Sequence, residues 1–230
     1  MAGSRIPNRE YLWLDQKNRE LVEKIIQNCP TFLGVVEGKK EKSIKLNTAL
    51  SVSQTGPLAL DAIGDCAFAQ INWFRPYKDV PFVIHTERMS SRETARELVS
   101  NETAPIEIRG FDSFYDASAL RIVNCDPKVC LNQMACDGMD FNPYIRETLS
   151  QILTSVDDGF FSLLKGEGLP LVVVGDQVMI SAMAYAFAKT YSRWLSTIIE
   201  MVPPPVSGIL VMPTEIPGVR RLIYRPVAVS

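Results

Sequence analysis

The sequence contains very little histidine: His85 is the only one in 230 residues. This scarcity excludes metal sites built from two or three histidine ligands, and it excludes any acid–base pair made of two histidines. His85 is still the one side chain whose ordinary pKa lies close to neutral pH. A lone histidine is more often a structural hydrogen bonder than a functional group, so we expect that role for His85.

The signatures of common nucleotide-binding and hydrolase sites are also missing. The sequence has no G-x-G-x-x-G after an expected strand and no Walker A loop, and neither G-x-S-x-G nor H-E-x-x-H occurs. These absences disfavour a nucleotide cofactor held by a glycine-rich loop. They also leave the chain without a strong catalytic motif.

The sequence has no large excess of positive or of negative charge. Lysine and arginine number 24, and aspartate and glutamate number 26, which makes the net charge −2. Proteins that bind nucleic acid through its phosphates carry a basic surplus, and this chain has none. Net charge therefore does not favour a nucleic-acid partner, and we expect a protein partner or further copies of the same chain.

Long hydrophobic runs are absent as well. The best candidate, residues 178–188, ends at Lys189, whereas a membrane-spanning helix needs about 20 apolar residues. The first residues of the chain do not form the apolar core of a signal peptide. The five cysteines, an odd number, argue against a secreted disulfide framework. We therefore expect a cytoplasmic, intracellular protein with no membrane segment.

The C-terminal quarter carries the clearest fold signal. A short apolar run ends at Gly175, helix-compatible residues fill 177–201, and three prolines precede a second apolar run at 208–212. This order predicts a strand–helix–strand unit, with two parallel strands joined by a long buried helix. The predicted fold class is α/β with a mixed sheet, and α+β stays open for the N-terminal half.

Hydrophobic periodicity predicts the remaining elements. Ser90 and Glu93 have the spacing of a capping box, which predicts that a helix begins at Ser90. These are helices over 10–28, 57–73, 90–99 and 142–156, and strands over 31–36, 43–53, 80–85, 105–109, 119–123 and 220–224.

One domain over residues 1–230 is the expected organisation. The polar stretch 126–142 is the only boundary in the sequence that would subdivide the chain. The subdivision would separate a β-rich half, 1–125, from an α/β half, 142–230.

Acidic residues follow several of the expected strands: Glu37, Asp112, Asp176 and Glu215. Ligands bind at the carboxyl ends of strands in α/β sheets, and carboxylate oxygens hold Mg²⁺ in phosphate chemistry. If the chain is an enzyme, we expect Asp112, Asp176 and Glu215 to be its catalytic residues, with Mg²⁺ as the cofactor. The plain alternative is that these carboxylates cap helices, Asp176 in particular.

Three cysteines, Cys125, Cys130 and Cys136, lie close together in the chain. Their C-x4-C-x5-C spacing is looser than the paired knuckles of structural zinc sites. They are candidate metal ligands if a fourth ligand comes from elsewhere in the chain. The competing interpretation is that they are buried or loop thiols without a metal.

Aromatic and basic residues suggest a binding surface, because Tyr, Trp and Arg are the common anchors of interfaces. We therefore predict a non-catalytic subunit of an assembly or scaffold, such as a viral one, that acts by self-association or by binding a partner. The alternative is a Mg²⁺-dependent phosphate-ester enzyme built on the strand-end carboxylates. The candidate binding residues are Trp73, Phe74, Arg75, Tyr77, Arg220 and Arg221.

Overall fold

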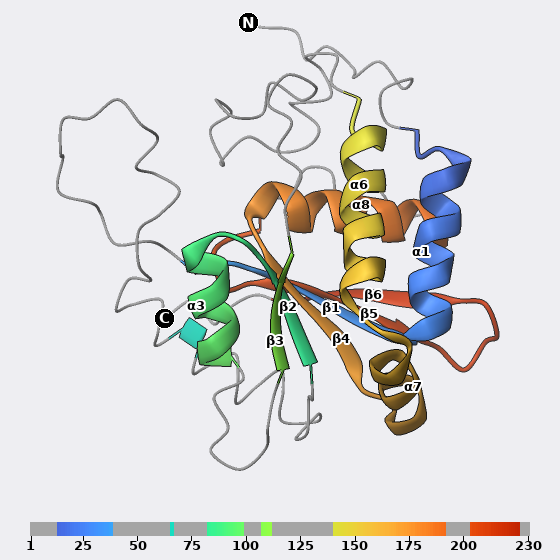
Figure 1. The fold of residues 1–230 in the computed structure, drawn as a ribbon. Coiled ribbons are helices and arrows are strands. Elements are labelled where there is room, and N and C mark those ends of the chain that lie inside the picture. Colours follow the sequence, from blue (N-terminus) through green and yellow to red (C-terminus); the bar gives the residue numbers. More distant parts are fainter. Residues whose placement is uncertain are drawn as a thin grey trace, which may run out of the picture.

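A six-stranded mixed sheet forms the centre of the part of the chain that the structure describes (Figure 1). The computed structural model describes residues 13–38, 65–66, 82–98, 107–111, 140–191 and 203–225. The strands lie in the order β3-β2-β4-β1-β5-β6, which confirms the predicted α/β fold class with a mixed sheet. Their bounds are β1 Thr31–Val36, β2 Phe82–Thr86, β3 Glu107–Phe111, β4 Pro170–Gly175, β5 Gly208–Pro213 and β6 Arg220–Arg225.

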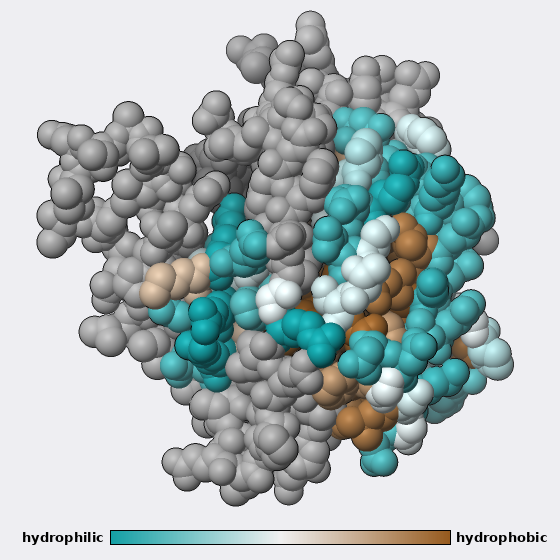
Figure 2. Space-filling view, viewed as in Figure 1, coloured by the Kyte–Doolittle hydropathy of each residue, from teal (hydrophilic) through white to brown (hydrophobic). Residues whose placement is uncertain are grey.

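Helices cover both faces of this sheet. α1, α6, α7 and α8 gather on one face, whereas α3 packs on the other face against β2, β3 and β4 (Figure 1). The outward side of α1 is hydrophilic (Figure 2), as its amphipathic sequence requires. The helix bounds are α1 Gln16–Asn28, α3 Met89–Leu98, α6 Asn142–Ser155, α7 Asp158–Glu167 and α8 Gln177–Tyr191.

Strand alternation divides the core into two layers. In β1, Phe32 and Val36 point toward the layer of α1, α6 and α8, and Leu33 and Val35 point toward α3. Every residue of β1, β2 and β4 is buried. Central parallel strands that are covered on both faces have this near-continuous apolar sequence.

The direction of β5 corrects the prediction of a parallel C-terminal unit. β1 pairs in parallel with β4, but β5 pairs antiparallel with β1. The Val206 amide donates to the Val36 carbonyl at 3.0 Å, and the Val36 amide donates to the Ser207 carbonyl at 2.8 Å. The chain thus enters β5 beside the carboxyl end of β1, so the strand has to run back along its neighbour.

The predicted buried helix of this unit is α8. Ten consecutive residues, Met179 to Ala188, are buried in it. Gly34 permits its close approach to β1, because a Cβ atom at position 34 would lie 3.2 Å from Ile209 Cγ1 and 3.4 Å from Ile180 Cδ1. The rest of the predicted helix, 192–201, lies outside the described residues. In the described part of the chain, no helix is long and apolar enough to cross a membrane.

Two helix boundaries differ from their predictions. α3 begins at Met89, so Ser90 lies inside its first turn and is not a cap; its carbonyl accepts a hydrogen bond from Thr94 Oγ1 at 2.7 Å. α7 follows the helix predicted over 142–156, and the sequence predicted no element there. Instead Asp157 accepts from the Phe160 amide at 3.0 Å and begins a new helix, which ends at Gly168 with a φ of 66°.

Several predicted elements fall where the structure describes little. The predicted strands over 43–53 and 119–123 lie outside the described residues. Of the predicted helix over 57–73, only residues 65–66 are described, and both are helical.

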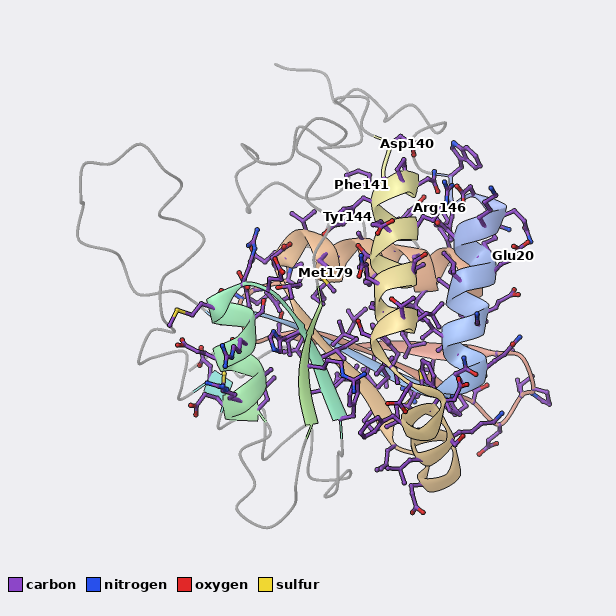
Figure 3. The ribbon with its side chains drawn as sticks, in the orientation of Figure 1. Glu20, Asp140, Phe141, Tyr144, Arg146 and Met179 are labelled. Atoms are coloured by element: carbon purple, nitrogen blue, oxygen red, sulfur yellow. The ribbon has the colours of Figure 1, made fainter. Side chains whose placement is uncertain are left out.

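A polar network joins the start of α1 to the start of α6. The side-chain oxygen of Asn142 accepts from the Asp15 amide at 2.9 Å and from Asn18 Nδ2 at 3.0 Å, and its Nδ2 donates to two further oxygens at 2.9 Å. Arg146, the next turn along α6, forms an ion pair with Asp15 (Figure 3). The network thus joins two helices that are far apart in the sequence.

We expect Asn142→Ala to lower the free energy of unfolding by about 2–3 kcal/mol, because it removes the side-chain oxygen that accepts from the Asp15 amide and from the buried Asn18 Nδ2, which then keeps only the backbone carbonyl of residue 142. The measurement is the urea midpoint, with an unchanged denaturant slope showing that stability alone has changed. Gln151→Ala is the control: it removes one bond within α6, to Glu147, and should cost less than about 0.5 kcal/mol. Equal midpoints for the two variants would contradict the role of Asn142.

Candidate functional site

Two acidic residues meet at the carboxyl edge of the parallel strands. Glu37 follows β1 and Asp176 follows β4, and these strands are neighbours in the sheet. The Glu37 amide donates to the Gly175 carbonyl at 2.7 Å, which extends the pairing up to the two carboxylates. Glu37 is 8% exposed and Asp176 is 7% exposed, so both charges lie largely out of water.

Arg88, two residues beyond β2, lies between these carboxylates. Its Nη1 is 3.3 Å from Glu37 Oε1, and its Nη2 is 3.6 Å from Asp176 Oδ2. Burial lowers the pKa of Arg88, but the attraction of Asp176 and Glu37 outweighs it and raises the pKa above the usual value. The guanidinium is therefore a permanent cation, and its side chain keeps 22% exposure. We call Glu37, Arg88 and Asp176 the edge cluster.

Hydroxyl groups from α3 and the end of β2 position Glu37. Ser91 Oγ donates to Glu37 Oε2 at 2.5 Å, and Thr86 Oγ1 donates to Ser91 Oγ at 2.7 Å. Thr94 Oγ1 accepts from the Gly38 amide at 2.8 Å. These three hydroxyls are buried, so the position of Glu37 is set by the packing of α3 on the sheet.

Asp176 has two roles at this edge. Its Oδ1 accepts from the Met179 amide at 2.9 Å and caps α8, as the plain alternative predicted. Its Oδ2 is buried and makes no hydrogen bond in the described part of the chain; Arg88 is its charged neighbour. Burial raises the pKa of Asp176, Arg88 opposes this shift, and Glu37 adds to it. The carboxyl group therefore holds a proton to higher pH than an ordinary aspartate does.

Tyr144 is a buried tyrosine of α6, in the core layer on the opposite face of the sheet from α3. Figure 3 shows it in the N-terminal half of α6, and Met179 in the first turn of α8. Its hydroxyl is buried, and its hydrogen-bonding neighbour is the buried side chain of Thr148. Burial raises the pKa of Tyr144, and the charge of Arg88 and the hydrogen bond with Thr148 lower it.

The segment 203–207 closes the edge on the side of β5. Gln177 Nε2 donates to the Pro203 carbonyl at 2.7 Å, which joins the segment to the start of α8. Val206 is buried and has a φ of 57°, in the left-handed region that a β-branched residue rarely adopts. Such backbone strain costs about 1–3 kcal/mol and persists only where the surroundings hold it. Here the bonds to Val36 hold it, one residue before Glu37.

His85 lies near the end of β2, and the edge cluster itself contains no histidine. Its Nδ1 is 2.6 Å from the Thr86 carbonyl, and a Cβ atom at Gly110 would lie 3.2 Å from its Cε1. Burial lowers the pKa of His85, the bond to Thr86 opposes this shift, and Arg92 and Arg96 lower the pKa further. A neutral ring with a backbone hydrogen bond agrees with the structural role expected from the sequence.

The predicted catalytic residues do not all converge. Asp176 is in the edge cluster, and Asp112 lies outside the described residues. Glu215 does not join Asp176 as predicted. It follows β5, which ends beside the amino end of β1, so it lies at the opposite edge of the sheet from Asp176. The reversed direction of β5 is the physical reason. Glu215 is also exposed, in the turn before β6.

The other candidate residues are only partly described. Arg220 and Arg221 lie on β6, the strand at one end of the sheet. Cys29 and Cys66 are buried thiols whose pKa burial raises to about 12. In the described ranges, no group of three or more His, Cys, Asp or Glu side chains is arranged for a metal. Outside them lie Trp73, Phe74, Arg75, Tyr77, Cys125, Cys130 and Cys136.

Sequence reasoning did not select two members of the edge cluster. Glu37 carries the same signal as Asp176, an acid directly after an apolar strand, and that signal was sufficient to find it. Arg88 carries no such signal, because its position between the carboxylates follows from the pairing of β2 with β4. Tyr144 looks in the sequence like any other apolar position of an amphipathic helix.

Comparison with known proteins identifies the fold. No family model matches the sequence, and no curated protein matches it. Solved structures do match: a mycobacterial glucosyl-3-phosphoglycerate phosphatase has a TM-score of 0.53 at 12% identity, over 87% of this chain and 100% of that one. Mycobacterial hydrolase 2 has a TM-score of 0.52 at 11% identity, over 87% and 93%. The fold is that of the α/β histidine phosphatases. At 11–12% identity, the similarity to these proteins shows the fold alone.

The comparison contradicts our main functional prediction. We predicted a non-catalytic assembly subunit because the sequence has no strong catalytic motif, but the structural neighbours are phosphatases and hydrolases. They favour the alternative, a phosphate-ester enzyme with strand-end carboxylates. A motif search detects only groups that are close in sequence, whereas Glu37, Arg88 and Asp176 follow three separate strands and meet only in the folded chain.

We expect Asp176→Asn to reduce the dependence of folding stability on pH. The pKa of Asp176 is raised in the folded protein, so stability is full below the ordinary pKa of about 4 and falls as pH rises through the raised value. Asparagine has no proton to lose, so this fall disappears. Urea unfolding across pH 4–8 measures it, with the exposed Asp158→Asn as control. Parallel curves for the wild type and Asp176→Asn would contradict the assigned pKa shift.

Proposed function

We propose that this protein hydrolyses a phosphate ester at the edge cluster. The main observation in support is that Glu37, Arg88 and Asp176 converge at the carboxyl ends of β1, β2 and β4. Ligands of open α/β sheets bind at this edge. The mycobacterial proteins of the same fold, a phosphatase and two hydrolases by name, support the class of reaction.

Each member of the edge cluster has a chemical role in the proposed reaction. Arg88 binds the phosphate oxygens through its planar guanidinium, which suits bidentate contact. Glu37 takes a proton from a water molecule, whose oxygen attacks phosphorus. As the ester P–O bond breaks, Asp176 transfers its proton to the departing alcohol oxygen. The raised pKa of Asp176 supports this last role, because a general acid has to be protonated at the working pH.

The proposal assigns both proton transfers to carboxylates, because the only histidine of the chain is His85. The ring of His85 makes a short contact with a backbone carbonyl at Nδ1, and burial lowers its pKa. A neutral ring of this kind does not supply the protonated acid that the departing alcohol needs. The buried Asp176 carboxyl does.

Loss of a proton-transfer group should lower kcat by about 10²–10⁴-fold. We expect a loss of this size for Glu37→Gln on every phosphate monoester that the protein hydrolyses. Asp176→Asn should lose far more on an alkyl phosphate than on 4-nitrophenyl phosphate, because nitrophenolate leaves without protonation. Steady-state kinetics with both substrates measure the difference, and Asp158→Asn, in the first turn of α7, should keep wild-type rates.

The pH profile gives an independent check on the role of Asp176. Activity on the alkyl substrate should fall as pH rises through the raised pKa of Asp176, because only the protonated carboxyl donates. The same fall in activity with rising pH should be much smaller for 4-nitrophenyl phosphate. Purified protein that hydrolyses none of a broad set of phosphate esters, or equal losses in Asp176→Asn for both substrates, would count against the proposal.

A further inference from the structure

The buried side of α3 has hydroxyl groups where a helix packed on a sheet usually has apolar side chains. Ser91 and Thr94 are both 0% exposed, and the buried apolar residues of the helix, Ala95 and Leu98, follow them in the chain. A buried hydroxyl costs free energy unless it is hydrogen-bonded, and alanine forms helices better than serine or threonine does. The first part of α3 therefore needs polar partners, and it finds them at Glu37 and Gly38.

Two hydroxyls form a chain of hydrogen bonds that ends on Glu37. Thr86 Oγ1 lies 2.7 Å from Ser91 Oγ, which lies 2.5 Å from Glu37 Oε2. An ionised carboxylate only accepts, so Ser91 has to give it the single hydrogen of its hydroxyl group. The hydrogen between Ser91 and Thr86 then has to come from Thr86. A hydroxyl that accepts one hydrogen bond donates a stronger one, so Thr86 strengthens the bond from Ser91 to Glu37.

This chain distinguishes the two oxygens of the Glu37 carboxylate. Oε2 accepts from Ser91 on the side of α3, whereas Oε1 lies 3.3 Å from Arg88 Nη1. Arg88 is the residue to which the proposed function assigns the phosphate oxygens. A water molecule that attacks phosphorus has to lie beside that phosphate, and therefore on the side of Oε1. The bond from Ser91 to Oε2 fixes the rotation of the carboxylate and keeps Oε1 on that side.

We infer that Ser91 is a positioning residue of the hydrolysis, with Thr86 as its support, and that the two hydroxyls orient Glu37 so that Oε1 takes the proton from water. The inference rests on the proposed function, because it concerns the residue that the proposed function makes the base. Neither hydroxyl has to touch the substrate. Both act through Glu37, so the effect of losing them should appear in the attack of water and not in the protonation of the departing alcohol.

Ser91→Ala removes the donor to Glu37. We expect kcat to fall about ten- to a hundredfold, the factor that a hydrogen bond to a charged group is worth, while KM changes little. The fall should be the same for an alkyl phosphate and for 4-nitrophenyl phosphate, because both need the attack of water. This equality distinguishes Ser91→Ala from Asp176→Asn, whose effect depends on the leaving group. Steady-state kinetics of the full chain with both substrates measure it.

Thr86 allows a matched pair of variants, because valine keeps its shape without the hydroxyl and serine keeps the hydroxyl without the methyl group. Thr86→Val should lower kcat by about three- to tenfold, less than Ser91→Ala does, because it weakens the bond to Glu37 without removing it. Thr86→Ser should stay close to the wild-type rate. Thr190→Val is the control: the Thr190 hydroxyl donates to the Ala186 carbonyl within α8, at 2.8 Å, and its loss should leave kcat unchanged.

A double-mutant cycle tests whether Ser91 acts through Glu37. The base is already missing in Glu37→Gln, so adding Ser91→Ala should lower kcat by less than about twofold further. A residue that only stabilised the fold would lower kcat by the same factor in both backgrounds. Circular dichroism and thermal unfolding check that each variant is folded at the assay temperature. If Ser91→Ala does not fold, Thr86→Val replaces it in the cycle, because that change keeps the volume of the side chain.

The outcomes separate this inference from the proposed function. Hydrolysis that is lost in Glu37→Gln but unchanged in Ser91→Ala would keep the proposed function and overturn the inference. A loss in Ser91→Ala that is repeated in full in the Glu37→Gln background would also overturn it, since Ser91 would then act independently of the base. A wild-type protein without hydrolysis would overturn both. A loss in Ser91→Ala that disappears in the Glu37→Gln background, with Thr86→Ser active, is the result that we expect.

Discussion

The contact of Arg88 with Glu37 and Asp176 is the interaction on which the carboxyl edge of the sheet depends. It connects residues that follow three different strands, and it does so with charges rather than with apolar side chains. Removing one partner of a buried ion pair costs about 3–5 kcal/mol, because the remaining charge has lost its compensation. The three residues are thus coupled, and none of them can change its charge without affecting the other two.

The elements around this contact serve to keep it in place. α3 brings Ser91 and Thr94 to Glu37 and Gly38, and α8 uses Asp176 as its cap. On the side of β5, the strained Val206 joins its segment to the end of β1. A helix cap alone would leave Asp176 at the protein surface. Here packing from both layers buries it, and burial is the main cause of its raised pKa.

Fold and chemistry are separable in this protein. The fold is shared with histidine phosphatases, yet the chain has one histidine, and that residue contacts a backbone carbonyl outside the edge cluster. One fold supports different groups at the same edge, because the strand ends define where side chains meet and not which side chains they are. The two carboxylates of the edge cluster, Glu37 and Asp176, therefore make proton transfer the chemistry to test at this edge.

The sequence by itself determined the α/β class, the buried helix α8 and the acid that follows β4, because hydrophobic periodicity and strand-end position are local properties. It also identified Asp176 as a helix cap. Only the tertiary structure decided that β5 runs antiparallel, that Glu215 lies at the far edge, and that Arg88 joins Glu37 to Asp176. Strand order and direction arise from contacts between distant segments, and no local pattern encodes which strand ends become neighbours.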